Sequence, residues 1–262
     1  MTRLCAAGFV MDMSQDNGKK KKIRVDQLLF ERGLVESRQR GQALLMAGQV
    51  LVNDTPITKA GQMVFDDAEI RIKGDSNPYV SRGGLKLEGA LDHYSVNPQG
   101  WVCLDVGAST GGFTDCLLQK GATKVYALDV GTNQLAWKLR SDPRVVSWEQ
   151  MHINRLTPEH ISEKLDLIVT DVSFISLTLV IPYLLPFMQQ GARLLAMVKP
   201  QFEVGKGEVG KGGVVRDEAQ QLEAVAKVET FLRERGFIPE AVCPAPIQGP
   251  KGNQEYFLYV NR

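Results

Sequence analysis

Leu-Asp-Val-Gly-Ala-Ser-Thr-Gly-Gly-Phe-Thr, residues 104–114, is the stretch that decides the fold. An apolar run leads into it, small residues fill its middle and helix-forming residues follow, so it predicts a buried strand, a tight turn and the start of a helix. A carboxylate, Asp129, stands near the end of the next apolar run. This order of features is typical of a site for an adenosine-containing cofactor.

The spacing of the glycines separates two classes of cofactor. Dinucleotide-binding turns carry the pattern G-x-G-x-x-G, in which a helix N-terminus meets a pyrophosphate, whereas Gly107 is followed by Ala, Ser, Thr, Gly and Gly. Asp105 at the strand end would repel phosphates but suits the cationic methionine end of S-adenosylmethionine, and Asp129 is placed for the ribose hydroxyls. The alternative is an ordinary strand-to-helix turn, which does not require the second carboxylate. We therefore expect S-adenosylmethionine to be held by Asp105, Gly107, Ala108, Ser109, Thr110, Gly111, Gly112, Phe113 and Asp129.

The composition is that of a globular protein that works inside the cell. The chain has 262 residues and a net charge of +1, which is enough for one large domain or two smaller ones. Its four cysteines show no paired spacing, which favours reduced thiols and a cytoplasmic location. No apolar run approaches the roughly 20 residues that cross a bilayer, so we expect no membrane partner. The three histidines lack metal-ligand spacing, so we expect no metal site.

The sequence divides into four parts. Residues 1–23 include four consecutive lysines and predict a disordered basic leader. Residues 24–74 predict a small α+β domain, because two short helices that end in glycine are followed by short apolar runs. Residues 75–82 predict a linker, and residues 83–262 predict a second, larger domain.

The larger domain alternates apolar runs with helical patterns. This alternation predicts an α/β fold, with a Rossmann-like sheet of seven mostly parallel strands and a long amphipathic helix over 217–235. The last two strands follow each other closely, which favours an antiparallel end to the sheet, as in Rossmann-like methyltransferases. The seven expected strands are 101–106, 124–130, 145–148, 165–172, 192–198, 238–243 and 254–260.

Residues 24–74 resemble an S4 RNA-binding domain in three motifs. These are R-x-D-x-x-L from Arg24, G-L-V-x-S-R over 33–38 and G-Q-V-L-V-N-D over 48–54. The resemblance implies RNA contact beside the two short helices, where phosphates supply salt-sensitive affinity. For the lysines at 19–22, RNA contact and a solvated tail stay open as alternatives. We expect RNA contacts from Arg24, Ser37, Arg38, Arg40 and Arg82.

Three charged residues stand at strand ends of the larger domain, and a fourth lies on a helix just before its sheet. Asp171 and Lys199 each close an apolar strand, Glu255 opens the last strand, and Lys86 lies on a helix just before the sheet. Open α/β sheets bind ligands at the carboxyl ends of their parallel strands, and an antiparallel last strand begins at that same edge. Each residue alone fits a surface salt bridge equally well, but the four together beside one glycine turn indicate a catalytic site.

Two lysines and two carboxylates near a methyl donor suggest transfer to a weakly acidic oxygen, such as a ribose hydroxyl. Such a hydroxyl needs a base, and a lysine can act as one when a nearby cation and partial burial lower its pKa. We assign Lys199 as the base and Lys86 as the neighbouring cation, with Asp171 and Glu255 orienting the two amines. Most of the rate then comes from positioning in line with the sulfonium.

Four further motifs make the chain similar to the TlyA family, in which an S4 domain precedes an FtsJ-like methyltransferase domain. They are SRGGLKL at 81–87, DVGASTGGFTD at 105–115, TDVSFIS at 170–176 and VKPQFE at 198–203. The resemblance covers nearly everything from Arg24 to the C-terminus. It implies a ribosomal RNA 2′-O-methyltransferase acting on cytidine in 16S rRNA, 23S rRNA or both, with ribosomal RNA or subunits as partners. The Lys-Asp-Lys-Glu tetrad of the family falls on Lys86, Asp171, Lys199 and Glu255.

Other interpretations of the sequence remain as alternatives. One is a non-catalytic RNA-binding protein of ribosome assembly, against which the complete tetrad argues. Another is a membrane-active haemolysin, a historical name in the family, which would need an export signal and a membrane-seeking segment. The glycine-rich run 205–212 has P-loop spacing until Gly212, which replaces the Ser or Thr that binds magnesium. We expect a mobile basic loop over the RNA cleft there.

Overall fold

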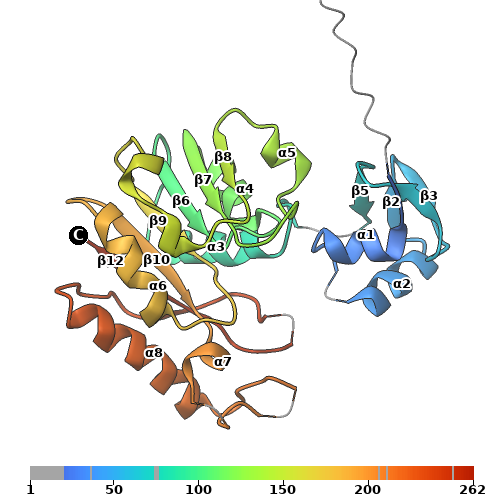
Figure 1. Ribbon diagram of the computed structural model, residues 1–262. Helices are drawn as coiled ribbons and strands as arrows, with labels where there is room; N and C mark the ends of the chain where they lie inside the picture. The colour runs from blue at the N-terminus through green and yellow to red at the C-terminus, as the bar shows by residue number, and fades with distance from the viewer. Residues whose placement is uncertain (1–20, 36, 74–76, 206, 211, 250) are drawn as a thin grey trace, which may run out of the picture.

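The computed structural model describes residues 21–35, 37–73, 77–205, 207–210, 212–249 and 251–262, and it shows two domains side by side (Figure 1). β1 pairs antiparallel with β4, and β2 lies between β3 and β5. Most of the expected leader lies outside the described residues, but Lys22 and Ile23 belong to β1, because their backbone pairs with Phe65 and Val64. The elements of the small domain are β1 (Lys22–Arg24), α1 (Val25–Glu31), α2 (Arg38–Met46), β2 (Val50–Val52), β3 (Thr55–Ile57), β4 (Met63–Phe65) and β5 (Ile70–Ile72).

Apolar side chains from both helices and the strands form the core of the small domain. Val25, Leu29 and Leu45 of the helices are fully buried. α2 begins at Ser37, whose Oγ accepts a hydrogen bond from Arg40 N, and such a cap stabilises a helix by about 1 kcal/mol. The α+β character predicted for this domain is confirmed.

The large domain consists of one sheet with helices on both faces (Figure 1). Its helices are α3 (Gly83–His93), α4 (Gly112–Gln119), α5 (Trp137–Arg140), α6 (Leu177–Leu184), α7 (Pro200–Glu203) and α8 (Glu218–Arg233), with short 3₁₀ turns η1 (Ile153–Arg155), η2 (Pro158–His160) and η3 (Leu185–Phe187). Its strands are β6 (Val102–Val106), β7 (Lys124–Leu128), β8 (Val145–Trp148), β9 (Leu167–Thr170), β10 (Arg193–Val198), β11 (Cys243–Pro244) and β12 (Tyr256–Asn261).

The strand order is β11-β12-β10-β9-β6-β7-β8. The five strands from β10 to β8 are parallel to one another, whereas β12 is antiparallel to β10 and β11 is antiparallel to β12. The predicted seven-stranded, Rossmann-like sheet with an antiparallel end is confirmed. The strand expected over 238–243 is much shorter, because Pro239 and Pro244 have no backbone N–H to donate to a ladder.

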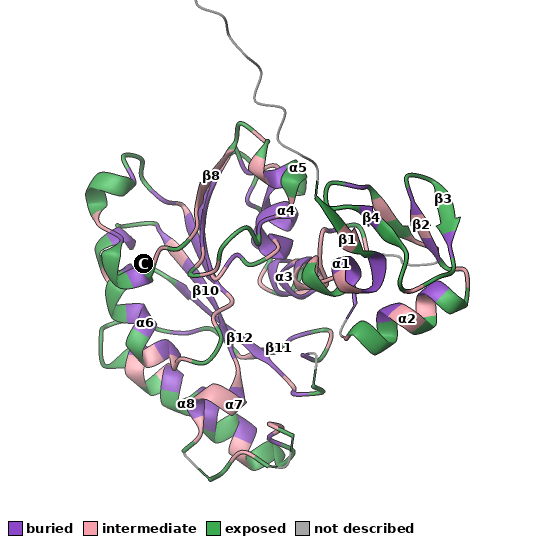
Figure 2. Cartoon of the chain, turned by 45° about the vertical axis from the view of Figure 1, so that its right-hand side comes forward, coloured by how far each residue is buried: buried purple, intermediate pink, exposed green. Residues whose placement is uncertain are grey.

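The two faces of the sheet bury separate apolar layers. Cys103 packs with α3, α4 and α5, whereas its neighbour Leu104 packs with α6 and α8, because successive side chains of a strand point to opposite faces. Figure 2 shows buried residues along the strands and along the inner sides of the helices. α8 is the helix predicted over 217–235, and the Asp217 side chain caps it by accepting from Ala219 N. No helix within the described residues is both long and apolar enough to cross a membrane.

Candidate active site

The turn between β6 and α4 has a backbone geometry that glycine adopts easily. Gly107 and Gly111 have φ angles of 87° and 96°, in the left-handed region that disfavours other residues. A Cβ on Gly107 would lie 2.6 Å from the carbonyl oxygen of Asp171, and one on Gly111 would overlap the side chain of Leu139. These two glycines therefore let the turn pass close to the end of β9 and to α5.

Asp105 is fully buried at the base of this turn. Its Oδ2 accepts a hydrogen bond from Thr114 Oγ1 (2.7 Å), whereas its Oδ1 has no partner among the described residues. Burial raises the pKa of this carboxyl to about 7. A buried carboxylate oxygen without a donor favours a cationic group nearby, which fits the charged methionine end of S-adenosylmethionine.

Asp129 follows β7 and lies against the same turn. Its Oδ2 accepts a hydrogen bond from Ser109 N (2.8 Å), and its Oδ1 accepts one from Gly131 N (2.7 Å). A carboxylate oxygen can accept more than one hydrogen bond, so both oxygens can also accept from hydroxyl groups. This arrangement fits the ribose of the cofactor and fixes the backbone of the turn.

The other residues expected at the cofactor have structural contacts. The carbonyl oxygen of Thr110 accepts from Ala136 N (3.2 Å), and a Cβ on Gly112 would lie 2.9 Å from Gly84 N. Ala108 is buried. The Phe113 ring is buried 6.1 Å from the Phe257 ring, centroid to centroid. The side chain of Phe113 thus belongs to the core, and Gly112 permits the close approach of α3.

The four charged residues predicted to be catalytic form two ion pairs. Lys86 Nζ lies 2.5 Å from Glu255 Oε2, and both side chains are buried. Lys199 Nζ lies 2.6 Å from Asp171 Oδ1, a charge contact rather than an aligned hydrogen bond, and donates to Ser173 Oγ at 2.8 Å. Each lysine therefore has a carboxylate partner that fixes its position.

Strand register brings the two pairs to one edge of the sheet. Val198 of β10 stands opposite Tyr256 of β12, so the adjoining residues Lys199 and Glu255 follow on at the same edge. β9 runs parallel to β10 on its other side and ends one residue before Asp171. The glycine turn follows β6, the next strand along. Asp171, Lys199 and the glycine turn thus follow the carboxyl ends of adjacent parallel strands. Glu255 precedes the antiparallel β12 at the same edge, and Lys86 of α3 reaches this edge through its ion pair with Glu255.

Sequence reasoning missed three residues of the loops at this edge. Ser173 contacts Lys199. Phe174 is 90% exposed, has a φ of 64° and lies 5.0 Å from the Phe202 ring, centroid to centroid. Each phenylalanine stands three residues after a catalytic candidate, in the motifs TDVSF and KPQF. This position was the sequence signal that could have placed them beside the site.

In the small domain, two of the arginines expected to bind RNA meet on one buried carboxylate. Asp26 is fully buried and accepts from Arg24 (Nε and Nη2, both 3.0 Å), Arg38 (Nη2, 3.1 Å) and Gln42 (2.9 Å). These hydrogen bonds, first of all the one from Arg24, hold the pKa of Asp26 well below its usual range. Both arginine side chains remain about half exposed, so part of each guanidinium faces outward.

The other three residues expected to bind RNA are placed differently. Ser37 is engaged as the cap of α2, and Arg40 is exposed on the first turn of that helix. Arg82 precedes α3 and donates to the carbonyl oxygen of Gln248 at 3.4 Å. Arg82 therefore lies near the tetrad edge, beside the segment that leads to Glu255.

The small domain contacts the cofactor turn of the large domain. The Cβ position of Gly33 lies 3.4 Å from Thr110 Oγ1 and 3.8 Å from Ser81 Cβ. The described part of the linker is attached to α4, because Val80 N donates to Asp115 Oδ2 (2.8 Å) and Gln119 donates to the carbonyl oxygen of Pro78 (3.0 Å). Both linker and small domain are thus fixed beside the turn.

The described part of the glycine-rich run 205–212 leads into a segment that is anchored beside Glu255. Asn253 is buried, donates to the carbonyl oxygen of Gly213 (2.9 Å) and accepts from Val215 N (3.0 Å). The run follows α7, so it lacks the strand that precedes a P-loop. Lys206 and Lys211, the lysines of the expected basic loop, lie outside the described residues, and among those described no cluster of three metal-ligating side chains occurs.

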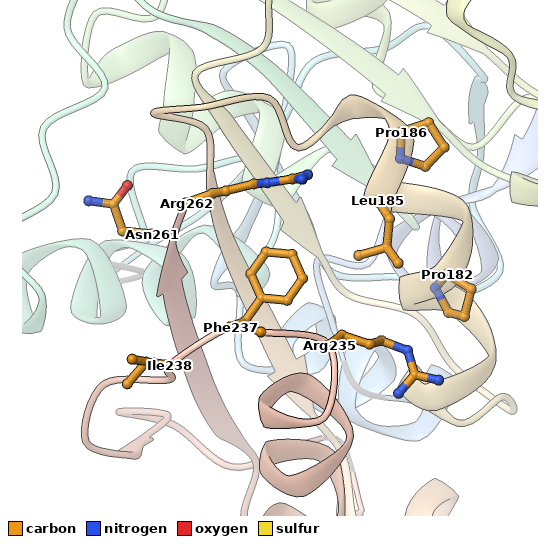
Figure 3. A pocket seen from close by; sticks show the side chains of 9 residues that line it. Pro182, Leu185, Pro186, Arg235, Phe237, Ile238, Asn261 and Arg262 are labelled. Carbon is orange, nitrogen blue, oxygen red and sulfur yellow. The ribbon is translucent and has the colours of Figure 1, made fainter.

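A cavity of about 670 Å³ lies elsewhere, at the end of β12 opposite Glu255 (Figure 3). Pro182, Leu185 and Pro186 line one side of it, and Phe237 and Arg262 line another. Its lining includes no residue of the glycine turn or of the tetrad. The candidate active site lies at the opposite edge of the sheet, where the tetrad lies and where open α/β sheets bind ligands.

Comparison with protein families defines the class of the chain. Residues 79–262 match the FtsJ-like methyltransferase family, and residues 23–70 match the S4 domain. The chain belongs to the FtsJ-like methyltransferases and carries an S4 domain in front. It is an S-adenosylmethionine-dependent methyltransferase, and the cofactor expected from the glycine turn is confirmed.

Similar proteins include members of the TlyA family, and the resemblance to that family is confirmed. The chain is 46% identical over 241 residues to the 16S/23S rRNA (cytidine-2′-O)-methyltransferase TlyA of Mycobacterium tuberculosis, covering 92% of this chain and 90% of that protein. It is 40% identical to Hemolysin A of Brachyspira hyodysenteriae, covering 90% and 99%. A solved Streptococcus thermophilus structure described as a hemolysin has a TM-score of 0.78 and 41% identity, covering 92% and 88%.

Proposed function

We propose that this protein methylates the ribose 2′-hydroxyl of a cytidine in ribosomal RNA. The observation that carries the proposal is the pair of ion pairs, Lys86 with Glu255 and Lys199 with Asp171, beside the glycine turn. The M. tuberculosis and Campylobacter jejuni relatives, both named as rRNA (cytidine-2′-O)-methyltransferases, support the choice of cytidine and of rRNA.

The tetrad supports a division of roles in the reaction. The role of base falls to Lys199, which takes the proton of the 2′-hydroxyl while the hydroxyl oxygen attacks the methyl carbon. Asp171 and Ser173 orient its side chain. Lys86, held by Glu255, is the cation that stabilises charge on the oxygen. S-adenosylmethionine supplies the methyl group, already activated by its sulfonium. The protein's main contribution is to hold the hydroxyl in line with the methyl carbon.

Surface chemistry supports RNA as the substrate. Arg24 and Arg38 present guanidinium groups that Asp26 holds in fixed positions, a geometry suited to phosphate. Phe174 offers an exposed aromatic face next to the tetrad, on which a base turned out of its helix can stack. We therefore assign RNA affinity to the small domain and base placement to the catalytic edge.

Ribosomal subunits from a strain that lacks this enzyme test the proposal. Wild-type protein with S-adenosylmethionine should methylate a cytidine ribose, whereas Lys199→Ala and Asp171→Asn should abolish the reaction without loss of cofactor binding. Lys124→Ala is the matched control. This lysine also forms an ion pair, with Glu163, but it stands at the amino end of β7, away from the tetrad. Absence of ribose methylation by wild-type protein on either subunit would contradict the proposal.

The same experiment distinguishes the other interpretations. A wild-type protein that binds subunits without methylating them would indicate an RNA-binding assembly factor, and lysis of erythrocytes by purified protein would support the haemolysin interpretation. The proposed reaction places the protein in the cytoplasm, where bacterial ribosomal subunits are assembled.

A further inference from the structure

We propose that Glu203 is a positioning residue for methyl transfer, which acts through Ser176 and Leu177 to hold the loop of Asp171 against Lys199. The inference rests on the proposed function, because it concerns the same site. Glu203 ends the short helix α7, four residues after Lys199. It belongs to neither ion pair of the tetrad.

Glu203 joins the segments that follow two adjacent strands. Its Oε1 accepts a hydrogen bond from Leu177 N (2.7 Å), and its Oε2 accepts one from Ser176 Oγ (2.6 Å). Residues 171–176 follow β9, whereas Glu203 follows β10. The carboxylate therefore ties the two segments together at their far ends, while Asp171 and Lys199 meet at their near ends.

The negative charge of the Glu203 carboxylate is compensated by hydrogen-bond donors and by a nearby lysine. The Glu203 side chain is 1% exposed, so its charge is costly unless it is paired and hydrogen-bonded. Lys227 of α8 places its Nζ 3.5 Å from Oε2 and also donates to the Glu203 carbonyl oxygen at 2.7 Å. The N-terminus of α6, which begins at Leu177, adds a favourable dipole. A buried charge with this set of partners has one well-defined position.

The loop that Glu203 ties down is held in a strained conformation. Phe174 has a φ of 64° although it carries a bulky side chain, and burial cannot compensate because the side chain is 90% exposed. The left-handed region is unfavourable for such a residue, which persists in it only where the surrounding structure imposes it. The hydrogen bonds from Ser176 Oγ and Leu177 N to Glu203, two and three residues after Phe174, hold the loop in this conformation. Without them we expect the loop to relax and to carry Ser173 and Asp171 away from Lys199.

Three substitutions test this role. Glu203→Ala removes both loop hydrogen bonds, whereas Glu203→Gln keeps an acceptor for Leu177 N. Lys227→Met is the comparison variant, because it removes the ammonium group beside the same carboxylate and the hydrogen bond to the Glu203 carbonyl oxygen, but neither of the two loop hydrogen bonds. We expect kcat for rRNA methylation to fall roughly 10–100-fold in Glu203→Ala and to recover in part in Glu203→Gln. In Lys227→Met, which keeps both loop hydrogen bonds, we expect a smaller loss than in Glu203→Ala.

Two further measurements separate positioning from general stability. The affinity for S-adenosylmethionine should stay unchanged in all three variants, because the glycine turn follows β6, whereas Glu203 bonds the segment that follows β9. Amide hydrogen exchange over residues 173–177 should accelerate more in Glu203→Ala than in Lys227→Met. If Glu203→Ala does not fold, Glu203→Gln carries both measurements, with a smaller loss of kcat and a smaller gain in exchange.

Three results would overturn the proposal. These are full activity in Glu203→Ala and Glu203→Gln, unchanged exchange over 173–177, and equal losses of kcat in Glu203→Ala and Lys227→Met. A wild-type protein without methylation activity would instead contradict the proposed function. The exchange measurement would then still decide whether Glu203 holds the loop.

Discussion

At the scale of single residues, Asp105 makes the stability of the protein depend on pH. Its folded pKa of about 7 exceeds the ordinary value of 3.8 because the carboxyl is buried. Between these values the folded chain binds more protons at this site than the unfolded chain, so the contribution of Asp105 to the free energy of unfolding decreases as pH rises from about 4 to about 7. Asp105→Asn keeps an acceptor for Thr114 and cannot ionise.

We therefore expect the wild-type protein to lose about 1–4 kcal/mol more than Asp105→Asn between pH 4 and pH 7. Urea unfolding of both proteins without cofactor, at unit steps of pH, measures this difference. Parallel curves for the two proteins would show that Asp105 is ionised throughout, contrary to the effect of its burial.

Phe174 is the second residue whose role can be measured by itself. Base stacking on an aromatic side chain contributes about 1–3 kcal/mol, so Phe174→Ala should lower kcat/KM for the RNA substrate roughly 5–150-fold. Phe174→Tyr should retain most of the activity, because it keeps the aromatic face. Leu179→Ala, which removes an exposed apolar side chain from α6, is the control. Equal activity of the Ala and Tyr variants would exclude stacking.

At the scale of helices and strands, the sequence predicted features that depend on neighbouring residues, such as helix caps and strand ends. The caps Ser37 and Asp217 stand where polar residues precede helical patterns, and Asp171 and Lys199 stand where apolar runs end. β1 has only three residues, too few for a periodic signal. The hydrogen bonds of Glu203 join residues 26 and 27 positions apart. No sequence pattern encodes such a contact, because it depends on the shape of two loops.

At the same scale, RNA contact beside the two helices of the small domain predicts how RNA affinity depends on salt concentration. Removal of one phosphate-binding side chain should reduce the slope of log affinity against log salt by about 0.7–0.9, so Arg24→Ala and Arg38→Ala should each weaken RNA binding and flatten this slope. Arg71→Ala removes an exposed arginine that pairs with Asp54 in the same domain and should change neither. Binding of an rRNA fragment at several salt concentrations measures the slope, and equal slopes for all four proteins would contradict RNA contact at Arg24 and Arg38.

At the scale of the whole molecule, the small domain reaches the cofactor turn through Gly33, and a pair of matched substitutions tests this contact. Gly33 and Gly48 have φ angles of 65° and 67°, a conformation that Asn tolerates among non-glycine residues. A side chain at Gly33 would meet Thr110 and Ser81, whereas one at Gly48 has no atom within 4 Å of its Cβ. Both Asn variants thus carry the same backbone cost, but only Gly33→Asn places its side chain against the turn.

We expect Gly33→Asn to weaken S-adenosylmethionine binding several-fold and to lower methylation in proportion, while Gly48→Asn stays close to wild type in both. Calorimetric titration of the cofactor, with thermal unfolding as a check on the fold, measures the difference. Thr110 belongs to the glycine turn, and Asp129 and the two left-handed glycines hold the backbone of this turn in place. A displacement of Thr110 therefore displaces the binding turn. Identical cofactor affinity of the two variants would show that the domains meet there without transmitting any change between the RNA-binding and cofactor-binding surfaces.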